Sequence, residues 1–358
     1  MQSKKSVNEI DEQKLHEFML KAVGDIGSTC SSMLVIIGEK LGLYKAMKES
    51  EPITSEELAK KTNTNERYIR EWLANQAAGG YITYNPKDGK YTLPPEQAMA
   101  LADENSPVYI LGVYQTIRSL FQDENKFIEM FQSQKGLRWG EHHPDLFEGT
   151  ARFFKPAYIG NLLNSWIPSL DGVEEKLKKG AKVADIGCGY GISTTIMAKA
   201  FPNSKFYGFD NHTHSIEQAI KQANEEGVTE NIEFNSISAN ESIGNDYDLI
   251  TFFDCLHDMG DPIGAMKFAK QSLKQDGTCM IVEPMANDKI EDNLNLVGRV
   301  YYAASTLICV PNSLADNGPA LGAQAGEKKI KEVVEAAGFT RFKRAAQTPF
   351  NIVYEVKH

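Results

Sequence analysis

The sequence predicts an α/β fold, in which a mostly parallel sheet with helices on both faces follows an α-helical winged-helix domain. Three observations predict it. From residue 181 onward, strand-like runs alternate with helical runs, as in parallel sheets. The last two strand-like runs follow each other across a short turn, which predicts one antiparallel strand. Before residue 105, helical runs lead into two short strands.

The chain has 358 residues, which is more than one compact domain usually holds. We expect a winged-helix domain over residues 1–104 and a helical linker over residues 105–180 that contributes to the substrate pocket. The third part, residues 181–358, is expected to hold the sheet and the main ligand site.

The N-terminal part has the pattern helix, helix, helix, hairpin. Residues 13–48 read as helices, with apolar residues near a 3.6 period from Leu34 to Met47. Thr54 and Glu57 have capping-box spacing, and the next helix stops at two glycines before the strands "YITY" and "KYTL". The first helices carry more apolar surface than one winged helix buries. We therefore expect a homodimer through this domain.

The remainder of the chain divides into a helical part and an alternating part. The linker looks mostly helical, with breaks at "KGLRWGEHHPD", Pro156 and Pro168. After it, "AKVADIG", "KFYGFD", "IEFNSIS", "YDLITFFD" and "GTCMIVEP" read as strands, with helices at 192–200, 214–226 and 262–274. The helix "EKKIKEVVEAAG" and strands near "FKRAAQ" and "FNIVYEVK" close the chain.

Composition excludes several classes of protein. A net charge of −10 argues against nucleic-acid binding, because phosphates require a Lys/Arg footprint. The five cysteines show neither CxxC pairing nor zinc spacing, so we expect no metal and a reducing compartment. The charged start lacks a signal core, and no apolar run is expected to reach the roughly 20 residues that span a bilayer. These features predict a soluble, cytoplasmic protein that binds no membrane.

The stretch "DIGCGYGIS" marks the main ligand site. Asp185 ends a strand-like run, and three glycines alternate after it: Gly187, Gly189 and Gly191. The spacing is neither GxGxxG nor a phosphate-binding P-loop. Asp210 ends the second strand 19 residues later, where an acid accepts from ribose hydroxyls. A ligand with a ribose, a positive charge and no phosphate fits, and S-adenosylmethionine is such a ligand.

These motifs, in this order, resemble the class I S-adenosylmethionine-dependent methyltransferases. With the winged helix and "FDCLHDMGDP", the chain is similar to plant-type small-molecule O-methyltransferases. It is also similar to bacterial winged-helix relatives with the blocks "GCGxG", "FDxLHDMGDP", "IVEP" and "GRxYYAAS…C.P", over roughly residues 30–358. The resemblance implies a Rossmann-like seven-stranded methyltransferase sheet, S-adenosyl-L-methionine as cofactor, and a winged helix that packs against its twin in a homodimer.

The resemblance also implies roles for the cofactor-site residues. Gly187 and Gly189 would lie under the methionine part of the cofactor, and Asp210 would bind its ribose. Where relatives place an acid for adenine, this chain has Ser238, so a hydroxyl or the backbone of Ala239 must substitute. Asp254, at the tip of the fourth strand, would lie near the amino-acid end.

A catalytic pair follows from the same resemblance. His257, with Asp258 after it, maps to the general base, and Glu283 maps to the carboxylate that orients it. A hydroxyl acceptor must lose its proton, and an imidazole is matched to that task near neutral pH. The alternatives are that His257 caps the fourth strand or stacks on the cofactor, and that Asp258 only caps the next helix.

Further residues are candidates for the wall of the substrate pocket. They come from two segments, "WGEHHPD" and "RVYYAASTLIC", and are His142, His143, Tyr301, Tyr302 and Ser305. Solvated loop histidines and ordinary core aromatics are the alternative interpretations. Cys188 and Cys255 are interpreted as packing residues beside the cofactor.

We therefore expect a methyltransferase acting on a small-molecule hydroxyl or thiol. A thiol acceptor needs less help from a base than a hydroxyl does. The alternative is a winged-helix transcription regulator that uses the methyltransferase fold as a sensor. Its recognition helix would carry Arg67 and Arg70 against Glu66 and Glu71, which is a poor phosphate footprint. The acidic total also disfavours a protein or nucleic-acid acceptor.

Overall fold

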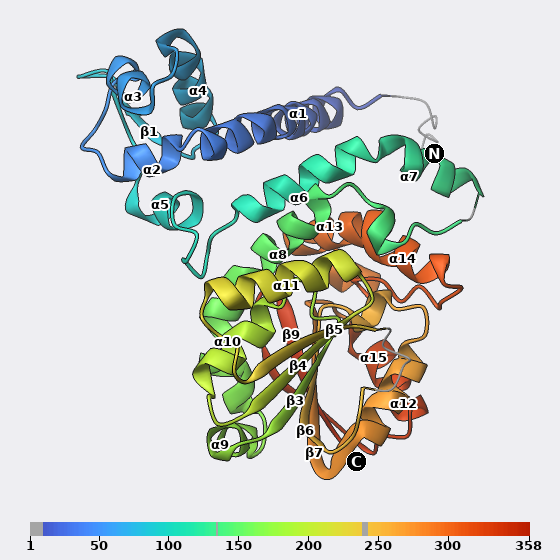
Figure 1. Ribbon diagram of the computed structural model, residues 1–358. Helices are drawn as coiled ribbons and strands as arrows, with labels where there is room; N and C mark the ends of the chain where they lie inside the picture. Colours follow the sequence, from blue (N-terminus) through green and yellow to red (C-terminus); the bar gives the residue numbers. More distant parts are fainter. Residues whose placement is uncertain (1–9, 134, 238–242) are drawn as a thin grey trace, which may run out of the picture. The chain divides into compact units, whose positions relative to one another are not determined.

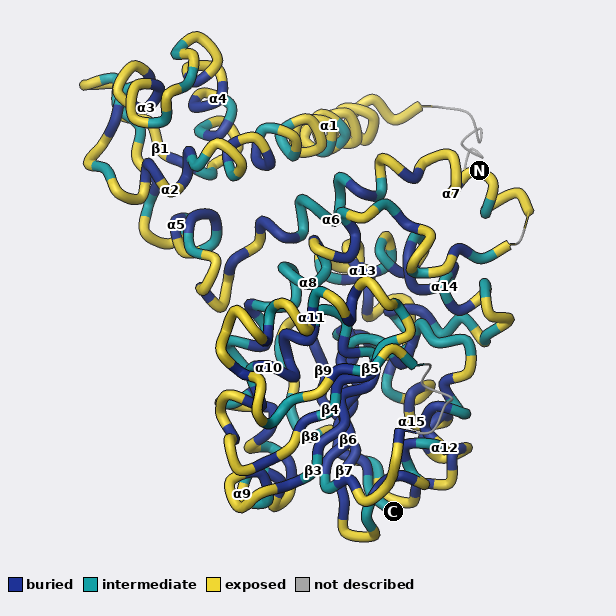
Figure 2. Tube along the Cα trace, viewed as in Figure 1, coloured by how far each residue is buried: buried dark blue, intermediate teal, exposed yellow. Residues whose placement is uncertain are grey.

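The computed structural model describes residues 10–133, 135–237 and 243–358. The chain forms two compact units, Met1–Tyr114 and Gln115–His358. The finer division predicted at residues 104 and 180 stays a prediction. The central strands of the second unit are buried along most of their length, whereas the two edge strands are more exposed (Figure 2).

The first unit has the predicted order of helices and a hairpin (Figure 1). Its elements are α1 (Glu12–Lys40), α2 (Leu43–Lys48), α3 (Ser55–Thr62), α4 (Glu66–Ala78), β1 (Thr83–Asn85), β2 (Lys90–Thr92) and α5 (Pro95–Leu101). The run predicted as helical over residues 13–48 divides at Gly42, whose φ of +68° is left-handed. The predicted capping box of Thr54 and Glu57 is present at the start of α3.

Helix α1 departs from one sequence expectation. By length and composition alone it is apolar enough to cross a membrane, whereas no run of that length was expected. In the sequence, Gly24, Asp25 and Ser28 interrupt the apolar residues of this segment. The structure forms one continuous helix across these three residues, so the apolar residues on both sides belong to the same helix. Most of this helix is exposed, unlike the core helix of a soluble domain.

The second unit begins with helices. They are α6 (Leu111–Gln122), which starts within the first unit, α7 (Glu124–Ser133), the short η1 (Trp139–Glu141), α8 (Asp145–Ala157), the π-helical η2 (Tyr158–Trp166), η3 (Ile167–Ser169) and α9 (Val173–Lys179). The predicted break at Pro156 is wrong. Proline removes one backbone donor, and the helix continues past it with the wider turns of η2.

The sheet that follows has seven strands. They are β3 (Lys182–Ile186), β4 (Lys205–Asp210), β5 (Ile232–Ser236), β6 (Tyr247–Phe253), β7 (Leu273–Pro284), β8 (Arg341–Gln347) and β9 (Asn351–Lys357). Their order is β5-β4-β3-β6-β7-β9-β8, and β9 is antiparallel to both of its neighbours. The predicted mostly parallel sheet with one antiparallel strand is therefore confirmed.

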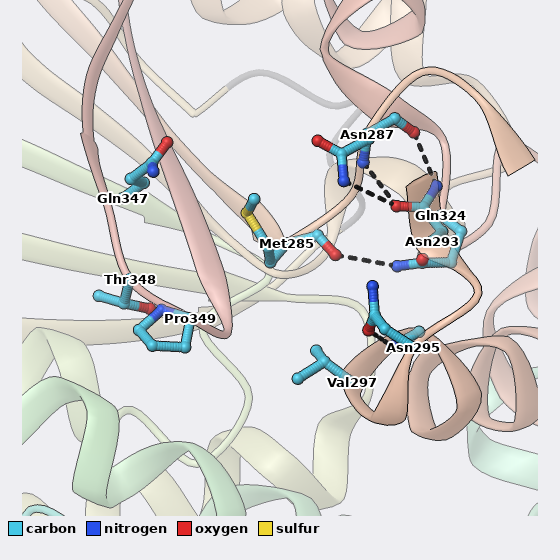
Figure 3. Close-up of a pocket in the computed structure, with 10 residues that line it drawn as sticks. Met285, Asn287, Asn293, Asn295, Val297, Gln324, Gln347, Thr348 and Pro349 are labelled. Carbon is cyan, nitrogen blue, oxygen red and sulfur yellow. Dashed lines mark hydrogen bonds between the residues drawn. The ribbon is translucent and has the colours of Figure 1, made fainter. Parts of the chain in front are cut away.

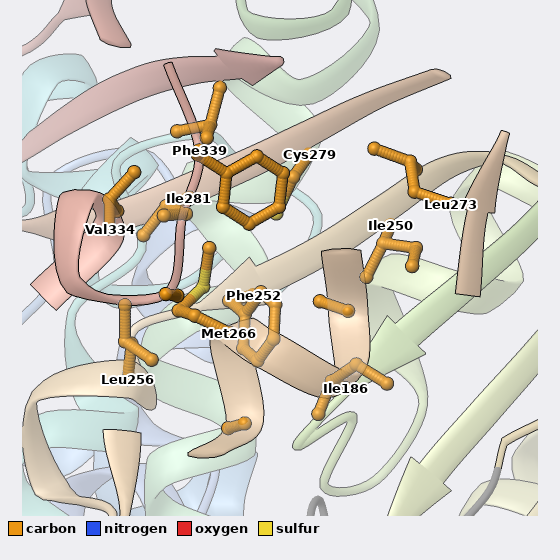
Figure 4. Packing of buried hydrophobic residues seen from close by; sticks show 14 of the residues in the cluster. Ile186, Ile250, Phe252, Leu256, Met266, Leu273, Cys279, Ile281, Val334 and Phe339 are labelled. Carbon is orange, nitrogen blue, oxygen red and sulfur yellow. The ribbon is translucent and has the colours of Figure 1, made fainter. Parts of the chain in front are cut away.

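Helices cover both faces of this sheet because successive strand residues point to opposite sides. On one face, Ile186 and Ile250 pack with α12 (Pro262–Ser272) and α15 (Gly326–Ala336) (Figure 4). On the other, Val183 and Leu249 pack with α9, η2 and α10 (Ile192–Ala200). The remaining helix of the alternating part, α11 (Thr213–Glu225), packs on β4 and β5.

A helical insertion lies between β7 and α15 in the chain. It consists of η5 (Ile290–Asn293), α13 (Leu296–Ala304), the π-helical η6 (Ser305–Cys309) and α14 (Val310–Ala315). The short η4 (Leu256–Asp258) follows β6. Asn312 and Ser313 donate hydrogen bonds of 3.1 and 2.8 Å to the backbone oxygens of Asp258 and Met259, which ties α14 to the segment after β6.

Candidate active site

The predicted site residues lie just past the carboxyl ends of β3, β4, β6 and β7. Parallel strands place these ends at one edge of the sheet, where ligands of such folds bind. Asp185 is the last but one residue of β3, and the glycine turn follows that strand. Asp210 ends β4, Asp254 and His257 follow β6, and Glu283 lies near the end of β7.

The glycine turn needs its glycines for two different reasons. All three have φ between +53° and +69°, the left-handed region. A Cβ on Gly187 would lie 2.8 Å from the sulfur of Cys255, and one on Gly191 would lie 2.5 Å from the ring of Phe234. A Cβ on Gly189 would meet no atom within 4 Å. The backbone at Gly189 is therefore open to a ligand.

Asp185 lies beneath this turn and is completely buried. Its carboxylate accepts hydrogen bonds from the hydroxyls of Ser193 at 2.7 Å, Thr194 at 2.6 Å and Thr251 at 2.9 Å. Burial raises the pKa of Asp185 to about 6, although the three hydroxyls oppose the rise. Through these three hydrogen bonds, Asp185 connects β3 to α10 and to β6 beneath the ligand site.

Asp210 connects the turn to the next strand. One carboxylate oxygen accepts from the backbone N–H of Gly189 at 2.9 Å, and the other accepts from that of His212 at 2.8 Å. Burial raises the pKa of Asp210, and these backbone donors oppose the rise. The ring of Phe147 lies 4.5 Å from the ring of His212, so aromatic side chains border this acid.

Asp254 has an uncommon backbone conformation for its residue type. Its φ is +50°, and its carboxylate accepts from the amide of Asn351 at 3.0 and 3.2 Å. Burial raises the pKa of Asp254 well above its ordinary value, and the nearby charge of Glu283 adds to this. Left-handed backbone in non-glycine residues concentrates at functional sites.

His257 and Glu283 form a buried pair. Nδ1 of His257 lies 2.5 Å from Oε2 of Glu283, and both side chains are at most 5% exposed. Burial disfavours the imidazolium, but the Glu283 carboxylate and the sulfur of Cys309 outweigh burial and raise the pKa of His257 well above its ordinary value. Oε1 of Glu283 has no hydrogen-bond partner within the part of the chain that the structure describes.

Asp258, directly after His257, is another carboxyl group with a shifted pKa. Burial, with the charge of Glu283 adding to it, raises the pKa of the Asp258 carboxyl to about 7. The helix after it, α12, is capped by Asp261, whose Oδ1 accepts from the N–H of Gly264 at 2.8 Å. The alternative that Asp258 caps this helix is therefore wrong, because Asp261 occupies that position.

The five candidates for the pocket wall have different surroundings. The hydroxyl of Tyr301 donates to the backbone oxygen of Phe350 at 2.8 Å, and that of Ser305 accepts from the N–H of Ala323 at 3.0 Å. Tyr301 and Ser305 are buried, whereas Tyr302 is half-buried. These two hydrogen bonds connect α13 to the chain at Phe350 and η6 to the chain at Ala323, so Tyr301 and Ser305 both have a structural role.

His142 and His143 lie at the start of α8. His142 is buried against Phe127, with Nδ1 3.4 Å from Asp123, and burial lowers its pKa although Asp123 opposes this. His143 is 38% exposed, and its Nδ1 accepts from the N–H of Asp145 at 3.2 Å. In the described residues, no group of three or more acidic, His or Cys side chains is arranged to hold a metal ion.

The predicted adenine contacts, Ser238 and Ala239, lie outside the described residues. A pocket of about 460 Å³ is present beyond the end of β7, beside the turn between β8 and β9 (Figure 3). Asn293 and Asn295 line it, but their amides are engaged in holding the loop from Asn287 and the start of α13. We assign no ligand to this pocket.

Three residues near the site were not among the predicted site residues. Asn351 binds Asp254 from the antiparallel strand, and Tyr158 of η2 is buried within reach of the charges of Asp254 and Asp185. Cys309 of η6 places its sulfur 3.3 Å from Nε2 of His257. Each comes from a distant part of the chain, so only the fold brings it to the site. The "C.P" block was the one available signal for Cys309.

Two family models match the chain. Residues 29–103 match an Rv2258c-like winged HTH domain, and residues 177–338 match a methyltransferase domain. Both predictions about domain type are thereby confirmed.

Curated relatives are similar over different lengths. A ubiquinone biosynthesis O-methyltransferase from Actinobacillus pleuropneumoniae serotype 7 is 33% identical over 133 residues, 35% of this chain and 53% of the relative. The chain thus matches about half the length of that protein. Myricetin 3-O-methyltransferase 3 from Solanum habrochaites is 23% identical over 371 residues, 95% of each chain.

Solved structures share the complete architecture. A candidate O-methyltransferase from Nostoc punctiforme PCC 73102 has a TM-score of 0.71 at 19% identity, covering 94% of this chain and 98% of its own. Human N-acetylserotonin methyltransferase, in complex with S-adenosylmethionine, has a TM-score of 0.66 at 15% identity and 99% coverage of both chains. The chain therefore joins a winged helix-turn-helix domain to a methyltransferase domain, and it has the fold of the winged-helix O-methyltransferases.

Proposed function

We propose that this protein is an S-adenosylmethionine-dependent methyltransferase that transfers the methyl group to a hydroxyl or thiol of a small molecule. The observation that carries the proposal is the buried His257–Glu283 pair, 2.5 Å apart, at the sheet edge that also holds the glycine turn. The methyltransferase domain at residues 177–338 contains all of these elements.

The residues present fit the cofactor. The backbone at Gly189 is open, and Asp210, beside it, suits a ribose. Asp254 and Glu283 place negative charge at the same edge, where burial makes charge costly unless a cation balances it. S-adenosylmethionine supplies an electrophilic methyl group on a positively charged sulfur.

In this proposal His257 removes the proton of the acceptor and Glu283 positions the ring. An ionised Glu283 can only accept, so Nδ1 of His257 carries a proton and Nε2 is the atom that receives the acceptor's proton. Glu283 then stabilises the imidazolium that forms. A positive charge bound nearby opposes that imidazolium, so we expect the pKa of His257 to be lower in the cofactor complex than without it.

The test is transfer of a labelled methyl group to a panel of phenols and thiols by the unmodified protein and by His257→Ala. With a phenol, the substitution should lower the rate by roughly 10²–10⁴-fold, the range for a lost general base. With a thiol the loss should be smaller and should fade as pH rises through the thiol pKa. Full activity of the variant toward a phenol between pH 6 and 9 would remove His257 as the base.

We further propose that residues 1–104 serve for dimerisation, that residues 105–180 contribute to the acceptor pocket, and that the protein acts in the cytoplasm. The exposed apolar residues of α1 support the first assignment. Tyr158, which lies in this segment and is buried within reach of the charges of Asp254 and Asp185, supports the second. The net charge of −10 supports a small acceptor rather than a nucleic acid.

A further inference from the structure

The two ring nitrogens of His257 have different partners. Nδ1 faces Glu283 at 2.5 Å, and Nε2 faces the sulfur of Cys309 at 3.3 Å. All three side chains are buried, with Cys309 only 8% exposed. Cys309 therefore contacts the same ring nitrogen that would take the acceptor's proton.

The backbone around Cys309 is tied to the segment that carries His257. Cys309 ends the π-helical η6, and such wide turns recur at functional sites. In the following α14, Asn312 and Ser313 donate to the backbone oxygens of Asp258 and Met259, directly after His257. The N–H of Gly322 donates to the backbone oxygen of His257 at 3.1 Å. These bonds hold the backbone near Cys309 against the segment that carries His257.

A thiol can pair with Nε2 whether or not the ring is charged. With the ring neutral, the S–H group donates to Nε2, and with the ring protonated, sulfur accepts from the Nε2 proton. The second bond is assisted by charge and is the stronger of the two. The thiol therefore favours the imidazolium while holding the ring in one orientation in both states.

We propose that Cys309 is a positioning residue for His257, an inference that rests on the proposed function. Cys309 and Glu283 together hold the imidazole so that Nε2 faces the acceptor. Nε2 has one lone pair, so the acceptor's hydroxyl must displace the thiol before it can lose its proton. A thiol is a weak hydrogen-bonding group, and the acceptor can displace it easily.

Two substitutions separate positioning from packing. Valine is β-branched and somewhat larger than cysteine, and it has no hydrogen-bonding group. Serine is slightly smaller than cysteine, and its hydroxyl both donates and accepts hydrogen bonds. If Cys309 positions the ring, Cys309→Ser should preserve function and Cys309→Val should not. If Cys309 only fills space, the order should be reversed, because a buried site tolerates valine better than serine.

The first measurement does not require an acceptor. Nuclear magnetic resonance of the full-length protein with ¹⁵N-labelled histidine gives the pKa of His257, whose signal is identified by its loss in His257→Gln. The unmodified protein and Cys309→Ser should titrate alike. In Cys309→Val the pKa of His257 should fall by roughly 0.4–1 pH unit, the equivalent of one hydrogen bond.

The second measurement is methyl transfer to a phenol that the unmodified protein accepts. Cys309→Val should lose roughly tenfold in kcat, with the KM for S-adenosylmethionine unchanged, while Cys309→Ser stays within roughly threefold. Cys279, buried among apolar residues of β7 and neighbouring strands, is the matched control. Neither Cys279→Val nor Cys279→Ser should move the titration of His257.

Two results would overturn the proposal: an unchanged titration in Cys309→Val, or the loss of activity in Cys309→Ser but not in Cys309→Val. The titration also separates this proposal from the proposed function. If no phenol or thiol is methylated by the unmodified protein but the valine variant still shifts the pKa, the hydrogen bond stands and the assigned reaction fails.

Discussion

Four aspartates at the edge of the sheet share one electrostatic property. Burial raises the pKa of Asp185, Asp210, Asp254 and Asp258 above the ordinary value of a carboxyl group. Each ionised form therefore costs free energy in the protein alone, and a cation bound among them lowers that cost. This distribution of charge supports a positively charged ligand and disfavours a phosphate.

At the residue scale, Asp210 provides the sharpest test of cofactor binding. We expect Asp210→Ala to weaken the binding of S-adenosylmethionine by roughly 1.5–3 kcal/mol, the scale of hydrogen bonds to a charged group. The loss includes the anchor that Asp210 provides to the N–H of Gly189. Calorimetry measures it, with the exposed Asp276→Ala as control. Equal affinity in the two variants would show that Asp210 does not contact the ribose.

At the element scale, Asp185 connects two strands and a helix. Its folded pKa of about 6 lies above the unfolded value of 3.8, because burial opposes the carboxylate. The stability contributed by this group is therefore present below pH 3.8 and is lost as pH rises through 6. Above that pH the loss amounts to roughly 3 kcal/mol, since one pKa unit is worth about 1.4 kcal/mol.

Asp185→Asn isolates this effect, because an amide does not titrate in this range. Relative to that variant, the unmodified protein should lose free energy of unfolding between pH 4 and pH 7, as measured by urea denaturation. The absolute stability of the variant also reflects how well an amide replaces the three hydroxyl contacts, so only the pH dependence of the difference is informative. A difference that stays constant with pH would contradict the shifted pKa.

Some elements could be predicted from sequence and others could not, for physical reasons. The glycine turn and the strands were predictable because φ preferences and alternation are local properties. The continuation of α8 past Pro156 was not, because packing against Phe253 and other strand residues stabilises η2. Asn351 and Cys309 reach the site from strand β9 and segment η6, so their roles depend on tertiary contacts.

At the element scale, the winged helix also bears on the DNA-binding alternative, which the charges of α4 do not favour. In α4, Arg67 forms an ion pair with Glu71 at 2.5 Å, and Arg70 forms one with Glu66 at 2.8 Å. Each arginine therefore has an acidic partner within its own helix, and these four residues together carry no net positive charge for a phosphate. The charge balance read from the sequence matches the geometry, and the comparisons give the regulator no support.

At the scale of the whole molecule, we propose that α1 mediates the association of two copies of the chain. Leu15, Ile26 and Ile37 are eleven residues apart, and Met19, Ala22, Cys30 and Met33 fall between them at spacings of three or four. This period places them on one stripe of a nearly straight helix. Met19 and Ile26 are 50% and 63% exposed. An exposed apolar stripe can pack against the same stripe of a second copy, as in a two-fold symmetric interface.

We therefore expect light scattering to give about twice the chain mass of 39.8 kDa. Ile26→Lys should shift the protein toward the monomer, because a lysine in the centre of an apolar interface must be desolvated without a partner. If this desolvation costs roughly 3 kcal/mol, association is weakened about 100-fold. Gln13→Lys adds the same charge to an exposed position off the stripe and should leave the dimer intact. Circular dichroism confirms that both variants are folded. A monomer at micromolar concentration that sediments with phospholipid vesicles would instead assign α1 to a membrane surface, an outcome that its length and composition allow.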